Sequence, residues 1–227
     1  MPVLALDTSS TVAVALVAAD GTTIAARSVH EERRHAEQLA PMIAELLTTT
    51  GTAPSELTAV VVGTGPAPFT GLRVGLVTAR ALGLALDIPV HGVCSLDAIA
   101  AQAAGDLGLA GGTDVLVVAD ARRREVYWAR YRVAAGTVEL VAGPGVGTAA
   151  QVTADGYADG AVVVGAGASL YPDALSAAGG SPLTCDPAML ARLALARSAR
   201  GEPLPTEPLY LRRPDVMAPA GPKRALA

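Results

Sequence analysis

Short apolar runs separated by turn residues make up most of the chain. In the first half, three such runs predict strands that follow one another closely: Val3 to Asp7, Val12 to Ala18 and Thr22 to Ser28. Asp20-Gly21, between the last two, is a strong hairpin turn. Apolar positions at helical spacing up to about Leu47 predict a helix, and Pro41 inside it predicts a kink or a restarted helix. The chain therefore begins as an antiparallel meander followed by a helix.

Two more strands and two helices complete the first half. Residues 57 to 62 and 89 to 93 are predicted strands, and the long apolar stretch between them is a predicted helix. We expect Ser95 to cap a helix over residues 96 to 104. A glycine-rich break at Gly105 to Gly112 ends this half.

The second half repeats the pattern of the first. Strands are predicted at 115–119, 125–132, 137–141 and 161–165, and helices near 170–177 and 187–200. Laying the two openings over each other aligns Asp7 with Asp120. Such a repeat predicts an α/β protein with a duplicated ribonuclease-H-like fold in two lobes. We place the lobes at residues 1–105 and 106–227, the second smaller and ending in a loose, proline-rich tail.

The long helix after residue 63 carries small residues along one ridge. These residues lie four apart and so share a helix face: Gly71, Gly75, Ala79 and Gly83. Each interior glycine costs roughly 0.8–1.0 kcal/mol relative to alanine, so the ridge indicates close approach of another backbone. That backbone belongs either to a partner chain or to this chain's own domain, packed tightly on an ordinary core helix.

The same region carries a family resemblance. GTGPAPFTGLRVG, residues 63 to 75, resembles the GPGSFTGLRIG signature of the bacterial TsaB (YeaZ) family. Ala67 and Pro68 stand where the family has Gly-Ser, whereas Phe69 to Gly75 agree well. That family is the dimerisation subunit of the machinery that places threonylcarbamoyl on N6 of adenosine 37 of tRNA.

Two further segments are similar to motifs of this family. The stretch His35 to Pro41 resembles its HSExLLP motif, and PLYLRRPDV, residues 208 to 216, resembles its C-terminal PxYxR segment. The resemblance covers most of the first half and the tail, and residues 105 to 201 only in outline.

The resemblance implies a two-lobed fold of the actin, sugar-kinase and Hsp70 group and a place in a protein complex. It implies pairing with the TsaD transferase through two helices of the first lobe, and a homodimer through the same surface when TsaD is absent. It also implies recruitment of the ATPase TsaE, with tRNA only an indirect partner. We expect the interface at His35, Leu39, Met42, Ile43, Leu46, Gly71, Arg73, Gly75, Leu76 and Ala79.

Charge and cysteine content narrow the functional classes. A net charge of −4 and a single lysine, Lys223, argue against a protein that grips nucleic acid by itself. The run Arg122 to Arg124 is interpreted as a solvated turn. Cys94 and Cys185 form no CxxC pair, and no signal segment or unbroken membrane-length apolar run is evident, so we expect a cytoplasmic protein.

An actin-like fold raises the question of ATP. Active members bind phosphates between the lobes with two acidic, glycine-containing hairpins. Asp7-Thr8-Ser9 partly provides the first, but Asp120-Ala121-Arg122 lacks the glycine that lets backbone N–H groups close on a phosphate. Gly165-Ala166-Gly167 imitates the adenosine turn only weakly. We expect no cofactor on the isolated chain, and ATP with Mg²⁺ only in an assembled complex.

Metal and hydrolase chemistry lack the necessary residues. His30 and His35 are five apart, so they do not stack as i, i+4 ligands would, unlike the HxxxH pair of the related TsaD, and His91 is isolated. No Gly-x-Ser-x-Gly elbow is present. We therefore expect no catalytic, cofactor or metal residues.

The sequence favours a non-catalytic scaffold subunit that binds and stabilises a TsaD-like transferase. The alternative is an enzyme, an ATP-dependent kinase or acyltransferase with its site between the lobes at Asp7 and Asp120.

Overall fold

The structure is a computed structural model of the chain that describes residues 1–29 and 35–212. Its strands are β1 (Val3–Asp7), β2 (Val12–Val17), β3 (Thr23–Val29), β4 (Ala59–Gly63), β5 (Val90–Val93), β6 (Asp114–Asp120), β7 (Glu125–Ala134), β8 (Thr137–Thr148) and β9 (Ala161–Val164). Its helices are α1 (His35–Thr50), the short 3-10 helix η1 (Pro54–Glu56), α2 (Phe69–Leu86), α3 (Ser95–Asp106), α4 (Ala149–Ala154), α5 (Ala166–Leu170) and α6 (Pro187–Ala199).

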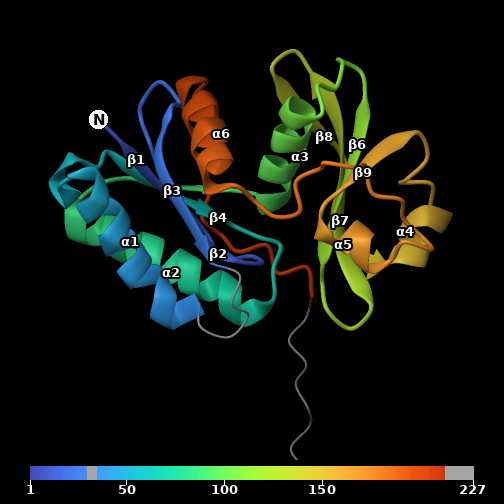
Figure 1. Cartoon of the computed structure of the whole chain (residues 1–227), viewed down its shortest axis with the longest axis horizontal. Helices are drawn as coiled ribbons and strands as arrows, with labels where there is room; N and C mark the ends of the chain where they lie inside the picture. Colours follow the sequence, from blue (N-terminus) through green and yellow to red (C-terminus); the bar gives the residue numbers. More distant parts are fainter. Residues whose placement is uncertain (30–34, 213–227) are drawn as a thin grey trace, which may run out of the picture.

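Two sheets form the two lobes (Figure 1). The first has the order β3-β2-β1-β4-β5 and the second β8-β7-β6-β9. In each, an antiparallel meander is extended by a parallel strand, β4 beside β1 and β9 beside β6. The predicted duplication of the meander and parallel strand is therefore confirmed.

The helices and sheets alternate in five layers. Helices α1 and α2 cover one face of the first sheet, and α6 covers its other face; α3 packs on the second sheet, whose far side carries α4 and α5 (Figure 1). Apolar residues of α3, α6 and both sheets share one core between the lobes. The last helix of the described residues, α6, thus packs on the first sheet, and α3, a helix from the first half, packs on the second. The division of the chain at residue 105 stays a prediction.

Most predicted elements are present, and three predicted details differ. Helix α1 is a single helix through the exposed Pro41, so of the two outcomes predicted there the restarted helix is wrong, and the kink stays a prediction. The N-cap of α3 is Cys94, because the Ser95 hydroxyl is turned to Asp7 instead. The helix predicted near 170–177 is wrong: α5 ends at Leu170, since Pro172 keeps the residue before it out of the helical region.

Helix α4 has no counterpart among the sequence predictions. Its signal is the capping box Thr148-x-x-Gln151, in which the Thr148 hydroxyl accepts a hydrogen bond from the Gln151 N–H at 3.2 Å. His30 and the end of the proline-rich tail lie outside the described residues. His35 opens α1, and its side chain also falls outside that description.

Candidate functional site

The glycine ridge of α2 faces the first sheet of this chain and not the outside. A Cβ at Gly75 would lie 2.5 Å from Thr8 Oγ1, and one at Gly71 would lie 2.9 Å from the Thr8 carbonyl oxygen. At the other end, a Cβ at Gly83 would lie 2.3 Å from Val90 Cγ2 in β5. The ridge exists for close packing within the first lobe, which corrects the expectation that a partner lies on it.

The Thr8 hydroxyl is seated in the ridge by two hydrogen bonds. It donates to the Gly71 carbonyl at 2.8 Å and accepts from the Gly75 N–H at 3.2 Å. These two backbone groups pair with each other in a regular helix. Thr8 therefore bridges one turn of α2 and fixes the loop after β1 against the start of that helix.

Most of the other residues expected at a partner interface are core residues. They are all buried in the cluster that joins α1 and α2 to the first sheet: Leu39, Met42, Ile43, Leu46, Leu76 and Ala79. Helical spacing correctly placed them on common faces, but those faces meet the sheet. As exposed contact residues they are wrong, because an amphipathic helix buries its apolar stripe in its own domain first. Arg73 alone of the described set is exposed.

The outer face of α2 carries different residues. Val77 and Leu84 are 66% and 86% exposed, and Arg73 and Arg80 lie on the same face. The neighbouring helix α1 exposes small residues, among them Ala44. We call this surface of α1 and α2 the outer helical face. The spacing of the two arginines, seven apart with Val77 between them, was the overlooked signal, because charged residues mark the solvent side of a helix.

Asp7 is fully buried at the end of β1 and supports the loop that follows it. Its carboxylate accepts hydrogen bonds from the Ser9 N–H at 2.9 Å, from the Ser9 hydroxyl and from the Ser95 hydroxyl at 2.6 Å. Burial raises the pKa of Asp7 against these hydrogen bonds. Gly63 is required beside it, since a Cβ there would lie 1.9 Å from Asp7 Oδ2. Asp7 is thus placed as a structural anchor beneath the loop.

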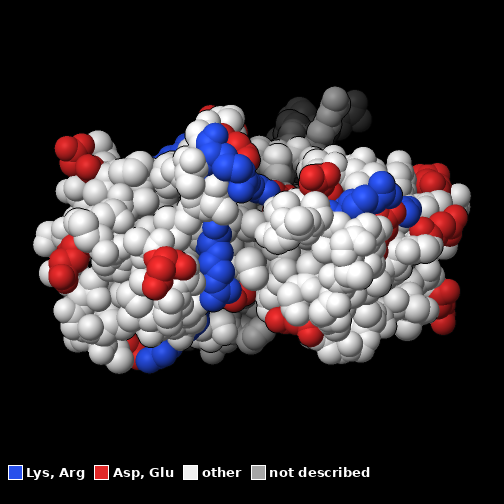
Figure 2. All heavy atoms as spheres, turned by 90° about the horizontal axis from the view of Figure 1, so that it is seen from above, with Lys and Arg blue, Asp and Glu red and all other residues white. Residues whose placement is uncertain are grey.

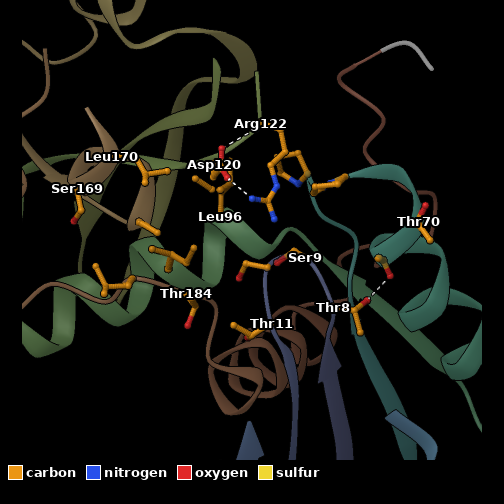
Figure 3. A pocket seen from close by; sticks show the side chains of 18 of the residues that line it. Thr8, Ser9, Thr11, Thr70, Leu96, Asp120, Arg122, Ser169, Leu170 and Thr184 are labelled. Carbon is orange, nitrogen blue, oxygen red and sulfur yellow. Dashed lines mark hydrogen bonds and ion pairs between the residues drawn. The ribbon is translucent and has the colours of Figure 1, made fainter. Parts of the chain in front are cut away.

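A cleft of about 760 Å³ lies between the lobes (Figure 3). The first lobe contributes the hydroxyl-rich loop Thr8 to Thr11 and the start of α2, and α3 supplies Leu96 and Ile99. The second lobe contributes Asp120, Arg122, α5 and the segment before α6. The volume suits a small molecule, and the lining is largely apolar with a few polar groups.

The charged side chains that line the cleft, Asp120 and Arg122, lie at the end of β6 and in the turn after it. Arg122, Arg123 and Arg124 all have left-handed backbone, with φ of 62°, 52° and 65°. Such φ values are uncommon for residues other than glycine, asparagine and aspartate. The turn is held by the Arg122 N–H, which donates to Asp120 Oδ1 at 2.7 Å, and by the Ala121 N–H, which donates to the Glu125 carbonyl at 3.1 Å.

The charges of this turn suit a polyphosphate poorly. The Arg122 guanidinium lies 3.3 Å from the Asp120 carboxylate, so its positive charge is already partly compensated (Figure 3). Among the described residues, the lining includes no lysine. A nucleoside triphosphate carries several negative charges and needs clustered cations, a metal ion or backbone N–H groups directed at it.

Metal ligands do not gather in the described part of the chain. No group of three or more His, Cys, Asp or Glu side chains that could hold an ion occurs within residues 1–29 and 35–212. His91 sits in β5, where burial lowers its pKa. Burial raises the pKa of both Cys94 and Cys185, and both are free thiols.

Seen from the side of α3 and α6, the surface has no broad basic patch. Figure 2 shows basic side chains in a narrow line near the middle of this face and in smaller separate groups elsewhere, with acidic groups scattered among them and toward both ends. Among the described helices, α2 is the one long and apolar enough to cross a membrane; its ridge packs on the first sheet.

Comparisons with known proteins point to proteins of tRNA threonylcarbamoyladenosine biosynthesis. The family model described as "TsaD: tRNA N6-adenosine threonylcarbamoyltransferase" matches residues 24–175. An uncharacterised protein of Mycobacterium tuberculosis is 42% identical over 94% of this chain and 93% of its own length. The tRNA threonylcarbamoyladenosine biosynthesis protein TsaB of Escherichia coli is 34% identical over 58% of this chain. The match spans about half, 55%, of that TsaB, and the match to a Mycobacterium leprae protein also spans 55% of its length.

A solved structure from Pseudomonas aeruginosa, described as similar to the peptidase YeaZ, is 31% identical with a TM-score of 0.78. It aligns with 93% of this chain and 99% of its own. This likeness extends over both lobes and confirms the predicted two-lobed α/β fold.

Proposed function

We propose that this chain, which belongs to the TsaB/YeaZ family, is the scaffold subunit that binds and stabilises a TsaD-like transferase in tRNA threonylcarbamoyladenosine biosynthesis. Membership of the family, and with it a role in this tRNA modification, follows from the identity to curated TsaB and the likeness to YeaZ. The scaffold role, the partner and the lack of catalysis are the proposal.

The outer helical face is the observation that carries the proposal. Val77 and Leu84 leave large apolar side chains in solvent on a helix whose other side is fully packed. Small exposed residues of α1, including Ala40 and Ala44, let a partner helix approach closely beside them. Arg73 and Arg80 flank the apolar positions as the polar rim of an interface would.

The family model for TsaD supports a partner of similar fold. It matches residues 24–175 of this chain, so the transferase and this chain share most of one architecture. A partner with the same helix pair can meet the outer helical face across an approximate two-fold axis. A second copy of this chain can do the same, which is the homodimer we propose in the absence of the transferase.

We propose no catalysis by the isolated chain. Asp7 lies beneath the first loop as a hydrogen-bonded anchor, and Arg122 is paired with Asp120 at the cleft. Neither arrangement offers the cations or backbone cradle that ATP with Mg²⁺ requires. We propose that such a nucleotide binds only in the assembled complex, with a TsaE-like ATPase as a further partner. Transfer RNA is then contacted indirectly, in the cytoplasm.

The enzyme alternative keeps one supporting observation, the size of the cleft. Calorimetry of the isolated chain with Mg-ATP separates the two. Micromolar binding that is lost in Arg122→Ala would favour the enzyme and contradict the scaffold proposal.

The interface is tested with charge introduced on exposed positions. Val77→Glu and Leu84→Glu are expected to weaken association with the transferase about thirtyfold or more each, the effect of removing an interface hot spot. Leu140→Glu is the matched control, because Leu140 is 52% exposed on β8 in the other lobe. The measurement is titration calorimetry with the purified transferase. Equal affinity for all three variants would refute the assignment of the outer helical face.

A further inference from the structure

The segment after α6 returns across the first lobe as an extended strap, residues 204–212. The Leu204 carbonyl accepts a hydrogen bond from the Gly92 N–H at 3.0 Å, and the Leu209 N–H donates to the Thr64 carbonyl at 2.9 Å. These bonds attach the strap to β5 and to the loop after β4. The strap is therefore fixed by backbone contacts and not by side chains alone.

The first lobe is shaped to receive this strap. A Cβ at Gly92 would lie 2.0 Å from the Pro205 carbonyl oxygen and 2.7 Å from Thr64 Cγ2. Contacts under 3.0 Å of this kind require something to shift, and backbone does not yield as a flexible side chain does. Glycine at position 92 therefore leaves the space through which the strap passes.

Side chains of α2 hold the strap from the outside. Arg80 donates to the Thr206 carbonyl at 2.8 Å and to its hydroxyl at 3.0 Å. Arg73 donates to the Tyr210 hydroxyl at 3.0 Å and lies 3.4 Å above the centre of the Phe69 ring. The Phe69 and Tyr210 rings pack with their centres 5.0 Å apart.

The end of the strap crosses to the second lobe. The Arg212 guanidinium donates to the Ala121 carbonyl at 3.0 Å and lies 3.1 Å from Glu125 Oε2. Figure 1 shows the end of the described chain between the lobes, on the side away from the upper parts of α3 and α6. Between α3 and α6, the Arg197 guanidinium donates a hydrogen bond to the Asp97 carboxylate at 2.7 Å. Arg212 therefore provides a link between the lobes at a separate place.

The residues that Arg212 holds are the two ends of the charged turn at the cleft. Ala121 and Glu125 bracket the left-handed residues Arg122 to Arg124, and Asp120 and Arg122 line the cleft (Figure 3). Three successive residues in this conformation cost free energy, so the turn needs support from outside itself. The strap supplies that support.

We propose that residues 204–212 are a tie between the lobes, in which the Arg212 side chain makes the contact with the second lobe. This tie limits how far the inter-lobe cleft opens. Because Arg73 and Tyr210 hold the strap against α2, the tie couples the outer surface of α2 to the turn at the cleft. The proposal concerns the isolated chain and does not depend on the identity of any partner.

The first test removes the contacts of Arg212 with the second lobe. Arg212→Ala is expected to speed amide exchange of residues 121–125 about tenfold, the effect of losing a charged hydrogen bond at a half-exposed site. Arg200→Ala is the matched control, since the exposed Arg200 pairs only with nearby Glu202 in the described contacts. Unchanged exchange in Arg212→Ala would overturn the proposal.

The second test measures the opening itself. Spin labels at Thr49→Cys in α1 and Ala150→Cys in α4 report the distance between the lobes, and both positions are exposed. Arg212→Ala should lengthen or broaden this distance, and Arg200→Ala should not. If residues 121–125 exchange faster but the distance between the labels is unchanged, Arg212 supports the turn alone. That result would overturn the proposal that the strap ties the lobes together.

The third test addresses coupling to α2. Tyr210→Ala removes the contact with Arg73 and Phe69 and leaves Arg212 in place. We expect it to speed exchange of residues 121–125 several-fold, in the same direction as Arg212→Ala. If exchange there stays at the wild-type rate, the coupling is wrong. Far-ultraviolet circular dichroism of every variant checks that the fold is retained.

Discussion

Adding one methyl group at Gly75 tests whether the ridge of α2 is an internal packing surface. In Gly75→Ala the new Cβ would lie 2.5 Å from Thr8 Oγ1, so the Thr8 hydroxyl must turn away. Two hydrogen bonds are then lost, each worth about 1 kcal/mol. The better helix propensity of alanine returns about 0.8–1.0 kcal/mol. With strain included, we expect a net loss of about 1–2 kcal/mol.

Gly105 in α3 is the matched control for this substitution. A Cβ there would meet nothing within 4 Å, so Gly105→Ala should be neutral or stabilising by up to about 1 kcal/mol. For a chain of this length, about 1–2 kcal/mol corresponds to a fall in Tm of about 2–8 °C in scanning calorimetry. If both variants melted alike, or if Gly75→Ala were the more stable, the close packing of Thr8 on the ridge would be refuted.

Two further predictions concern charge and thiols. Hydrogen bonds from Arg132 and Arg130 lower the pKa of Asp114 to about 2, so Asp114 stabilises the fold above its ordinary pKa near 4 and loses that contribution as the pH falls toward 2. Asp114→Asn should therefore unfold at lower urea than wild type at pH 7, with the difference shrinking below pH 4; a difference independent of pH would contradict this. Because Cys185 is buried and burial raises the pKa of its thiol, Cys185 should not react with a thiol reagent at pH 8 until urea unfolds the chain, and rapid modification of Cys185 in the native protein would contradict it.

Local patterns predicted the order of elements well. The hairpin at Asp20-Gly21 has its own signal, and Gly21 takes the positive φ of 86° that such a turn uses. The repeated meander was visible because apolar runs and turns recur in the same order in both halves. These features depend on residues close in sequence, which a pattern can report directly.

The spacing of the small residues alone did not show what the ridge of α2 packs against. The positions of Gly71, Gly75 and Ala79 show that they share a face, but the same spacing serves a partner chain and a sheet of the same domain equally. In the structure, the ridge packs against Thr8 and Val90 of the same chain. The face of α2 that stays exposed carries Val77 and Leu84. Both residues are apolar, so they do not interrupt the apolar pattern and give no sign of their exposure.

Contacts from the tail were hidden for a different reason. Tyr210 and Arg212 belong to a proline-rich segment without periodicity, and their partners lie far away in sequence. Nothing local shows that Arg212 meets Ala121. The run Arg122 to Arg124 was predicted as a solvated turn, and its residues are exposed, but its left-handed backbone was not predicted because arginine carries no signal for that conformation.

The internal packing of the ridge also decides how a partner interface can be examined. A large residue at Gly75 would displace Thr8 and loosen the loop after β1, so weaker association in such a variant would report a damaged lobe and not a lost contact. Val77 and Leu84 are free of this difficulty, because their side chains already stand in solvent. Weaker binding with unchanged stability at these two positions can only come from the surface itself, and this combination separates an interface from a core.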